Sequence, residues 1–355
     1  MSRVRRLLRS TALWTVLLLL GLEASARLAT RGPALLALGI ASYPTYYQHR
    51  LGLARRAAPP TLLVVGDSAA ERGVDACALG RRRAGRGLNL AFPSGGVREA
   101  DRLMQAAGID ARGEVELLYA VNPLNVASYS SWVDPSFADL RKRVGLGDAL
   151  LGQASVLFGR REAVRALFGR LFKPGRTREE FEAQVLAAGA CGRETPLPAP
   201  DELPSAEERA AQVSRYAKAW LELFTEPLGP SAVASLAGTL GRWHAEGHRL
   251  SVVLMPLRAD FAAYLDQQWP GLRARKRELW GEVAREAGAR LLYCADAVPD
   301  VGLFEDPVHL NELGRRQLTA CLGAELDGTP SCCQPADPVL PAAAPSGAPP
   351  REPFD

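Results

Sequence analysis

A serine and a histidine that lie far apart in the sequence both have neighbours suited to nucleophilic catalysis. Ser68 ends the stretch LLVVGDS, in which four apolar residues lead directly into Gly-Asp-Ser, and His309 lies three residues after Asp306 in the stretch DPVHLN. A serine hydroxyl becomes a useful nucleophile when a base reaches it, and a carboxylate can orient that base. We therefore predict that Ser68 attacks, His309 takes its proton and Asp306 orients the imidazole. The simpler interpretation of Gly-Asp-Ser alone is a helix cap.

The elements that must position these residues follow an α/β pattern. Apolar runs predict strands at 61–65, 88–92, 115–121, 249–257 and 290–294, and helical spacing predicts helices at 69–79, 97–107, 231–245, 260–287 with an interruption at Pro270, and 312–326. The run at 115–121 is continuously apolar, as in a strand buried on both faces. The pattern predicts a three-layer sandwich around a five-stranded parallel sheet. Ser68 would then lie at the carboxyl end of a strand, where open sheets bind ligands.

The chain divides into four predicted parts. Residues 1–31 form a signal anchor or signal peptide, 32–60 a connector, 61–326 the α/β domain and 327–355 a disordered tail rich in proline and alanine. Within the domain, residues from about 124 to 230 break the alternation of strands and helices. We predict a helical insertion there, placed as a cap over the α/β domain.

The N-terminus predicts a location outside the cytoplasm. Four arginines precede an apolar run that is short for a spanning helix, and the ASA sequence at 24–26 fits a signal-peptidase site. A membrane anchor and a secreted form released by cleavage both remain open. The positive residues stay on the inner side in either case, so the body of the protein is exported.

Composition argues against nucleic acid as a partner and against a zinc framework. The formal net charge is +4 over 355 residues, with no basic stripe interleaved with aromatics, so we do not expect nucleic-acid binding. The six cysteines are too dispersed for a zinc framework, and we expect neither a metal site nor a cofactor. One or more disulfides fit an oxidising compartment, but their pairing cannot be read from the spacing.

The two chemical stretches resemble the first and last signature blocks of the SGNH (GDSL) hydrolase family, and Gly314 extends the match of the last block. The resemblance covers roughly 61–326, outside the insertion, and implies a flavodoxin-like sheet and the triad named above. It also implies that the Ser68 N–H, Gly95 or Gly96, and Asn122 hold an oxyanion. The sequence departs from the family pattern at Ala69, Ala120 and Pro123, where the family has leucine, glycine and aspartate.

The GVD stretch at 73–75 and the NLAFP stretch at 89–93 are similar to a membrane-anchored, extracytoplasmic branch of that family, which includes the alginate O-acetylation proteins. This resemblance implies a serine esterase or O-acyltransferase that acts on acyl esters of a surface polysaccharide, with acetyl esters as the leading candidates. The expected substrate is an acylated carbohydrate or another acyl ester. The expected partner is a membrane-bound O-acyltransferase. A catalytically silent binding or scaffold subunit of an envelope assembly, and a lipid or carboxyl esterase, are the alternatives.

Overall fold

A computed structural model of the protein describes residues 14–15, 17–18, 20–21, 43–57, 59–93, 95–109, 114–124, 204–225 and 230–335. Most of the predicted anchor, most of the predicted insertion and residues 336–355 lie outside these ranges. In the part of the chain described, no helix is long and apolar enough to cross a membrane.

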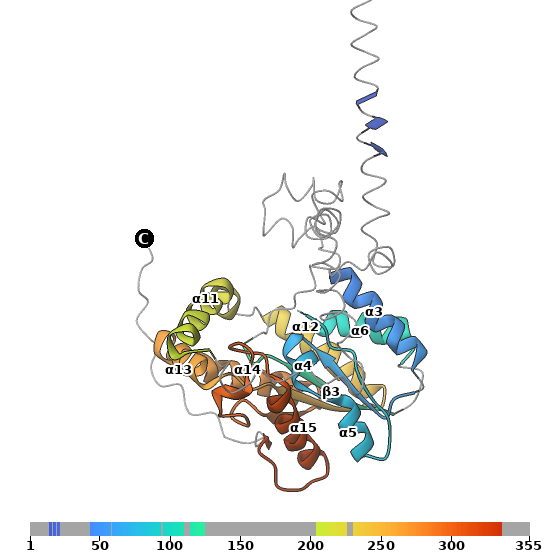
Figure 1. Ribbon diagram of the computed structural model, residues 1–355. Helices are drawn as coiled ribbons and strands as arrows, with labels where there is room; N and C mark the ends of the chain where they lie inside the picture. Colours follow the sequence, from blue (N-terminus) through green and yellow to red (C-terminus); the bar gives the residue numbers. More distant parts are fainter. Residues whose placement is uncertain are drawn as a thin grey trace, which may run out of the picture.

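The predicted fold class is confirmed (Figure 1). Five parallel strands pair in the order β2-β1-β3-β4-β5, and a short antiparallel strand, β6, follows β5 at the edge. The strands are β1 (Leu62–Gly66), β2 (Gly87–Asn89), β3 (Glu116–Val121), β4 (Arg249–Leu254), β5 (Arg290–Tyr293) and β6 (Gln334–Pro335). Gly66 pairs with Ala120, so the central strands β1 and β3 end at the same level. The residues that follow them, including Ser68 and Asn122, therefore meet at one edge.

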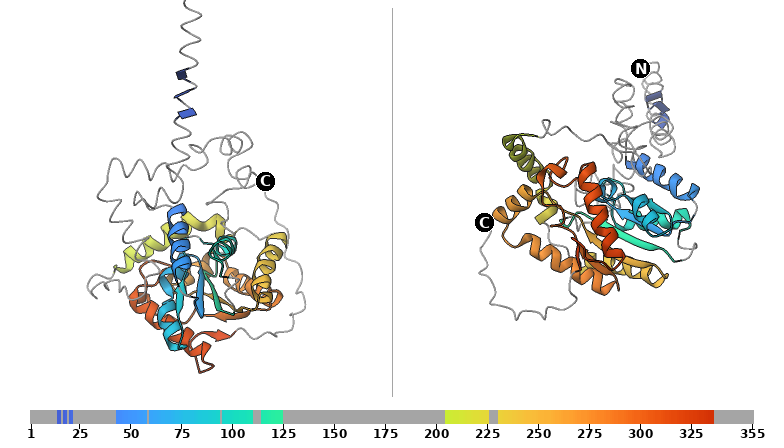
Figure 2. Two further views of the ribbon diagram at one scale, coloured as in Figure 1. Left: turned by 90° about the vertical axis from the view of Figure 1, so that its right-hand side faces the viewer. Right: turned by 60° about the horizontal axis from the view of Figure 1, so that its bottom comes forward.

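Helices cover both faces of this sheet, as Figure 2 shows. One face packs against α3 (Tyr43–Arg56), α6 (Val97–Ala107), α12 (Pro230–Ala245) and α14 (Leu272–Glu286), and the other against α4 (Ser68–Gly73), α5 (Ala76–Arg82) and α15 (Glu312–Leu326). Along β1, Leu63 and Val65 belong to the first face, whereas Leu62 and Val64 belong to the second. Such alternation on a fully buried strand produces two cores, which accounts for the continuous apolar run in the sequence.

Two predicted helices are divided in the structure. The helix predicted at 69–79 is two helices, α4 and α5, because Asp75 caps a new helix by accepting from the Ala78 N–H at 2.9 Å. The helix predicted at 260–287 is interrupted at Pro270 as expected, giving α13 (Ala259–Gln268) and α14. The described end of the insertion contains α11 (Ala206–Thr225), where helical sequence was predicted.

Both ends of the predicted domain need correction. Helix α3 lies in the predicted connector, yet it buries Leu51 and Ala54 in the core of the sheet, so the folded unit begins before residue 61. The predicted tail begins too early, because the chain returns to the sheet at β6 and two disulfides hold this return, Cys294–Cys333 and Cys321–Cys332.

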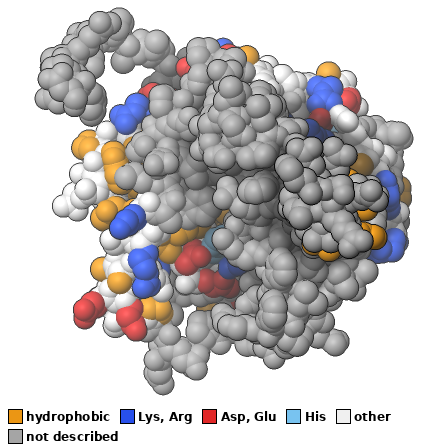
Figure 3. Space-filling view, turned by 90° about the horizontal axis from the view of Figure 1, so that it is seen from above, with side chains coloured by type: hydrophobic (Ala, Val, Ile, Leu, Met, Phe, Trp, Pro, Cys, Tyr) orange, Lys and Arg blue, Asp and Glu red, His pale blue; other side chains and the backbone are white. Residues whose placement is uncertain are grey.

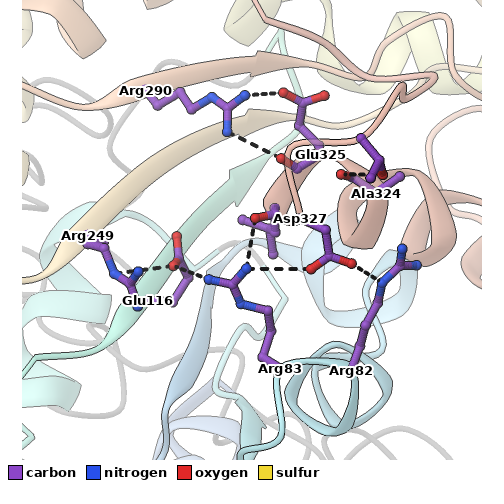
Figure 4. A network of polar contacts seen from close by, with 10 residues as sticks. Arg82, Arg83, Glu116, Arg249, Arg290, Ala324, Glu325 and Asp327 are labelled. Atoms are coloured by element: carbon purple, nitrogen blue, oxygen red, sulfur yellow. Dashed lines mark hydrogen bonds and ion pairs between the residues drawn. The ribbon is translucent and has the colours of Figure 1, made fainter.

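The amino edge of the sheet is bound by charge. The first residues of β3, β4 and β5 form ion pairs with one another or with the ends of α5 and α15 (Figure 4). The charged members of this network are Arg82, Arg83, Glu116, Arg249, Arg290, Glu325 and Asp327. Most of these side chains are partly exposed, and such pairs contribute little stability individually. The network therefore lies at the amino edge of the sheet, opposite Ser68, and does not occupy the carboxyl edge, where Ser68 and Asn122 lie.

Gly66 is required where β1 ends. Its φ is +144°, and a Cβ atom there would lie 1.8 Å from the Ala120 carbonyl oxygen. We expect Gly66→Ala to lower the free energy of unfolding by about 2–5 kcal/mol, because it adds backbone strain and an overlap between adjacent strands. Gly238→Ala is the matched control, since it lies in α12 with nothing within 4 Å of the added Cβ. That control should gain about 0.5–1 kcal/mol from helix propensity. Denaturant titration of both variants compares them, and equal effects would contradict this account.

Candidate active site

The structure brings Ser68, His309 and Asp306 together in one hydrogen-bonded chain. The Ser68 Oγ lies 2.8 Å from the His309 Nε2, and the His309 Nδ1 lies 2.7 Å from the Asp306 Oδ2. Ser68 is the first residue of α4, and His309 lies in the loop before α15, a separation of 241 residues. This order of contacts lets the imidazole accept the serine proton through Nε2 while the carboxylate fixes Nδ1.

The loop that carries the acid and the base is held by its own backbone. The Asp306 Oδ1 accepts the N–H groups of Val308 and His309, both at 2.9 Å, so one carboxylate shapes the loop and orients the imidazole. Phe304 and Leu310 form an antiparallel bridge that closes the loop. Asn311 then caps α15, accepting from the Leu313 and Gly314 N–H groups at 3.1 Å.

Hydrogen bonding decides the charge of Asp306. Burial acts to raise the pKa of this carboxyl, but the His309 side chain and the Val308 and His309 N–H groups outweigh burial and lower the pKa below its usual value. Asp306 is therefore ionised wherever the fold is intact at moderate pH. An ionised partner stabilises the imidazolium that forms when His309 takes a proton.

A second carboxylate, Asp67, joins the two sides of the site. Its Oδ1 accepts the Ala69 N–H at 3.0 Å and so caps α4, and its Oδ2 accepts the Asn122 N–H at 3.0 Å. The side chain is 2% exposed. The sequence indicated only the cap, because the second bond depends on the register between β1 and β3. Asp67 thus fixes Asn122 relative to the nucleophile.

Asn122, the predicted side-chain oxyanion donor, has an amide group that is held by a neighbouring backbone group. Its Oδ1 accepts the Leu124 N–H at 3.0 Å, which holds the amide group in a single orientation. Within the described residues its Nδ2 donates to no acceptor, although the residue is only 6% exposed. The Ser68 N–H opens α4, where a helix supplies no acceptor for it. Ser68 and Asn122 follow two adjacent strands, β1 and β3, whose carboxyl ends lie at the same level.

The structure does not offer the predicted glycines as free donors. The Gly95 N–H donates to the Phe92 carbonyl at 2.8 Å, closing a turn, and the Gly96 N–H donates to the Glu99 Oε2 at 3.2 Å in a capping box. Gly95 has a different requirement, since a Cβ there would lie 2.4 Å from the Gly66 carbonyl oxygen. The loop therefore packs against the end of β1, and its glycine permits that contact.

Asn89 is a site-supporting residue that the sequence did not single out. It ends β2, and its Nδ2 donates to the Ala70 and Val74 carbonyls at 3.2 and 3.0 Å, which satisfies the buried end of α4. Its Oδ1 accepts the Ala91 N–H at 3.0 Å. The only signal was its place in the NLAFP stretch, which gave no role for the side chain.

A third apolar cluster forms a wall next to the triad loop. Leu124 follows Asn122, Val308 precedes His309, and both pack with side chains of α11 and α13. The buried Arg258 fixes this wall through two hydrogen bonds. Its side-chain Nη1 donates to the Gln212 Oε1 at 2.9 Å, and its backbone N–H donates to the Pro307 carbonyl at 3.0 Å. Figure 3 shows this side of the molecule from above, where acidic side chains and histidine surface can be seen side by side. The end of the insertion is therefore anchored beside the candidate site.

Comparison of the chain with known protein families and with curated proteins finds no match. In the described part of the chain, no cluster of three or more His, Cys, Asp or Glu side chains is arranged to hold a metal ion. The function is therefore inferred from the geometry of the site and from the sequence motifs.

The lowered pKa of Asp306 predicts a pH-dependent stability. Its ordinary value is 3.8, so the stability from its folded-state bonds is fully present above about pH 4 and is lost as pH falls through the lower folded value. We expect Asp306→Asn to be less stable than the wild type at pH 6, with the difference shrinking between pH 4 and pH 2. Denaturant titrations across this range measure the difference. A gap that stays constant with pH would contradict the assignment.

Asn122 gives a separate kinetic prediction. We expect Asn122→Ala to slow modification of Ser68 by a fluorophosphonate about 10²- to 10³-fold, the cost of one oxyanion donor. Asn122→Asp is the matched variant, because it keeps the size of the side chain and the bond from Leu124 but removes the donor. It should be at least as slow. Wild-type rates in both variants would remove Asn122 from the oxyanion site.

Proposed function

We propose that this protein is an extracytoplasmic SGNH-type serine esterase or O-acyltransferase. Its proposed substrates are acyl esters of a surface polysaccharide, with acetyl esters as the leading candidates. The observation that carries the proposal is the continuous contact from the Ser68 Oγ through His309 to Asp306, at 2.8 and 2.7 Å. The resemblance of the GDS and DPVHLN stretches to the SGNH blocks supports the choice of ester chemistry.

In the proposed reaction the Ser68 oxygen attacks the acyl carbon as His309 Nε2 takes the serine proton. The negative charge moves to the acyl oxygen, where the Ser68 N–H and the Asn122 Nδ2 donate to it. The imidazolium then returns its proton to the departing alcohol, and an acyl-serine ester remains. Water or a sugar hydroxyl attacks that ester with His309 again as base, which gives hydrolysis or transfer. These steps use side chains of the chain alone and require no cofactor.

The location is proposed from two observations. Disulfides persist in oxidising compartments, and the described fold contains Cys294–Cys333 and Cys321–Cys332. In the N-terminal segment, Trp14, Leu17, Leu18 and Leu20 are 47–70% exposed, and apolar groups of this size are usually covered by a membrane or a partner. We propose that the N-terminal segment anchors the protein in the cytoplasmic membrane and that the folded domain lies on the outer side. A membrane-bound O-acyltransferase is the proposed partner. Secretion after cleavage of the segment is the alternative.

One observation favours a second candidate function. The N–H groups of Gly95 and Gly96 both donate elsewhere, so the proposed oxyanion site has fewer donors than the family pattern implies. A catalytically silent binding or scaffold subunit of an envelope assembly would tolerate this loss.

A mass measurement tests the proposal. We expect the purified full-length chain to gain a single adduct from a fluorophosphonate probe, and Ser68→Ala and His309→Ala to gain none, since the serine needs its base to react. Ser205→Ala is the control for nonspecific labelling, because Ser205 only caps α11, and it should label like the wild type. Folded wild-type protein without an adduct would favour the silent subunit instead.

A further inference from the structure

The helix that presents Ser68 is too short to hold itself in place. Helix α4 has six residues, and isolated helices shorter than about 12–15 residues are marginal in water. Asp67 and Asn89 satisfy its two ends, but end caps do not fix its rotation or its distance from neighbouring segments. Apolar packing of Ala69 and Ala70 against the sheet holds the helix from one side, and a buried polar contact holds it from another.

That contact comes from α3, outside the predicted domain. The Arg50 guanidinium is 1% exposed, and its Nη2 donates to the Glu71 Oε1 at 2.5 Å, one turn of α4 after Ser68. Its Nε donates to the Ala91 carbonyl at 2.9 Å. Ala91 belongs to the segment that runs from Asn89 to the turn at Gly95. A single planar group therefore binds the nucleophile helix and the segment that closes over the end of β1.

A pair buried this deeply is poorly explained by stability alone. Removing two charges from water is costly, and apolar residues of similar size often stabilise a protein as well or better. Burial raises the pKa of Glu71 to about 7, even though Arg50, Arg72 and His309 act to lower it. Burial also lowers the pKa of Arg50, against the effect of Glu71. The fold keeps both groups in a position that disfavours the charged form of each.

We propose that Arg50 is a positioning residue for Ser68, holding α4 and the segment at 89–96 in the arrangement that places the hydroxyl against His309. This inference deepens the proposed ester chemistry and rests on it. Helix α3 is then part of the catalytic unit, and the chain between the N-terminal segment and the sheet contributes directly to the site.

The test uses full-length variants and two measurements. Arg50→Met/Glu71→Gln removes both charges and leaves no unpaired buried charge, so it should fold. We expect its maximal rate of inactivation by a fluorophosphonate, kinact, to fall at least tenfold, while the probe's KI stays within twofold. We also expect hydrogen exchange to rise at least tenfold in peptides covering 66–75 and 89–96, but not in peptides of α15.

Two further variants separate positioning from general destabilisation. Arg50→Lys keeps a cation beside Glu71 but lacks the fork that reaches Ala91, so exchange should rise at 89–96 more than at 66–75, with an intermediate kinact. Arg290→Met/Glu325→Gln removes an ion pair at the opposite edge of the sheet and should change neither kinact nor exchange in these segments.

Each outcome decides one question. Wild-type kinact and wild-type exchange in the Arg50→Met/Glu71→Gln variant would overturn the positioning role. Failure of the wild type to react with the probe would overturn the proposed function, while exchange at 66–75 and 89–96 would still decide whether Arg50 positions α4. If the double variant does not fold, the segment pattern of Arg50→Lys decides instead, and equal exchange in both segments would count against the proposal.

Discussion

The site depends on the close approach of the two central strands at their carboxyl ends. Gly66 brings β1 against the Ala120 carbonyl, and Asp67 then spans the two strand ends with one bond to α4 and one to Asn122. A larger residue at 66 would separate the strands, and the carboxylate would no longer reach both partners. Ser68 and Asn122, the proposed nucleophile and oxyanion donor, are thus placed relative to each other by one contact between adjacent strands, which is a shorter and stiffer connection than two independent loops could provide.

The two edges of the sheet are built from the same residue types used in opposite ways. At the amino edge, arginines and acids are mostly partly exposed and shared among several partners, so we expect the loss of any one to have a small effect on stability. At the carboxyl edge, Arg50 and Glu71 are buried and have specific partners, so geometry rather than number determines their effect. The ion pairs at the amino edge join neighbouring elements, whereas the Arg50–Glu71 pair at the carboxyl edge holds one short helix, α4.

Much of this arrangement could be predicted from residue types. Apolar runs indicated the parallel sheet, and Ser68, Asp306 and His309 were predicted as a triad because their residue types suit it and two short stretches resemble known signature blocks. The structure brings the three side chains within hydrogen-bonding distance. The sequence could not show whether the Gly95 N–H is free to bind an oxyanion, because that depends on whether this N–H closes a turn with the Phe92 carbonyl, as it does in the structure. The place of α3 was also missed, since an amphipathic helix shows that one face is buried but not what buries it. Arg50 looked like any other arginine until its two acceptors, both distant in sequence, were known.

In the proposed ester chemistry, the choice between hydrolysis and transfer would follow from what surrounds the acyl-serine rather than from the triad. The same ester serves both outcomes, and water competes unless a wall and a bound acceptor exclude it. Leu124 and Val308 provide apolar surface on the two segments that carry Asn122 and His309, and Arg258 ties α11 to the triad loop through Gln212 and the Pro307 carbonyl. Any movement of α11 would therefore be transmitted to the base through contacts already made. We expect acceptor selection to act through this connection, because it joins the end of the insertion directly to the loop whose imidazole would activate the acceptor in the proposed reaction.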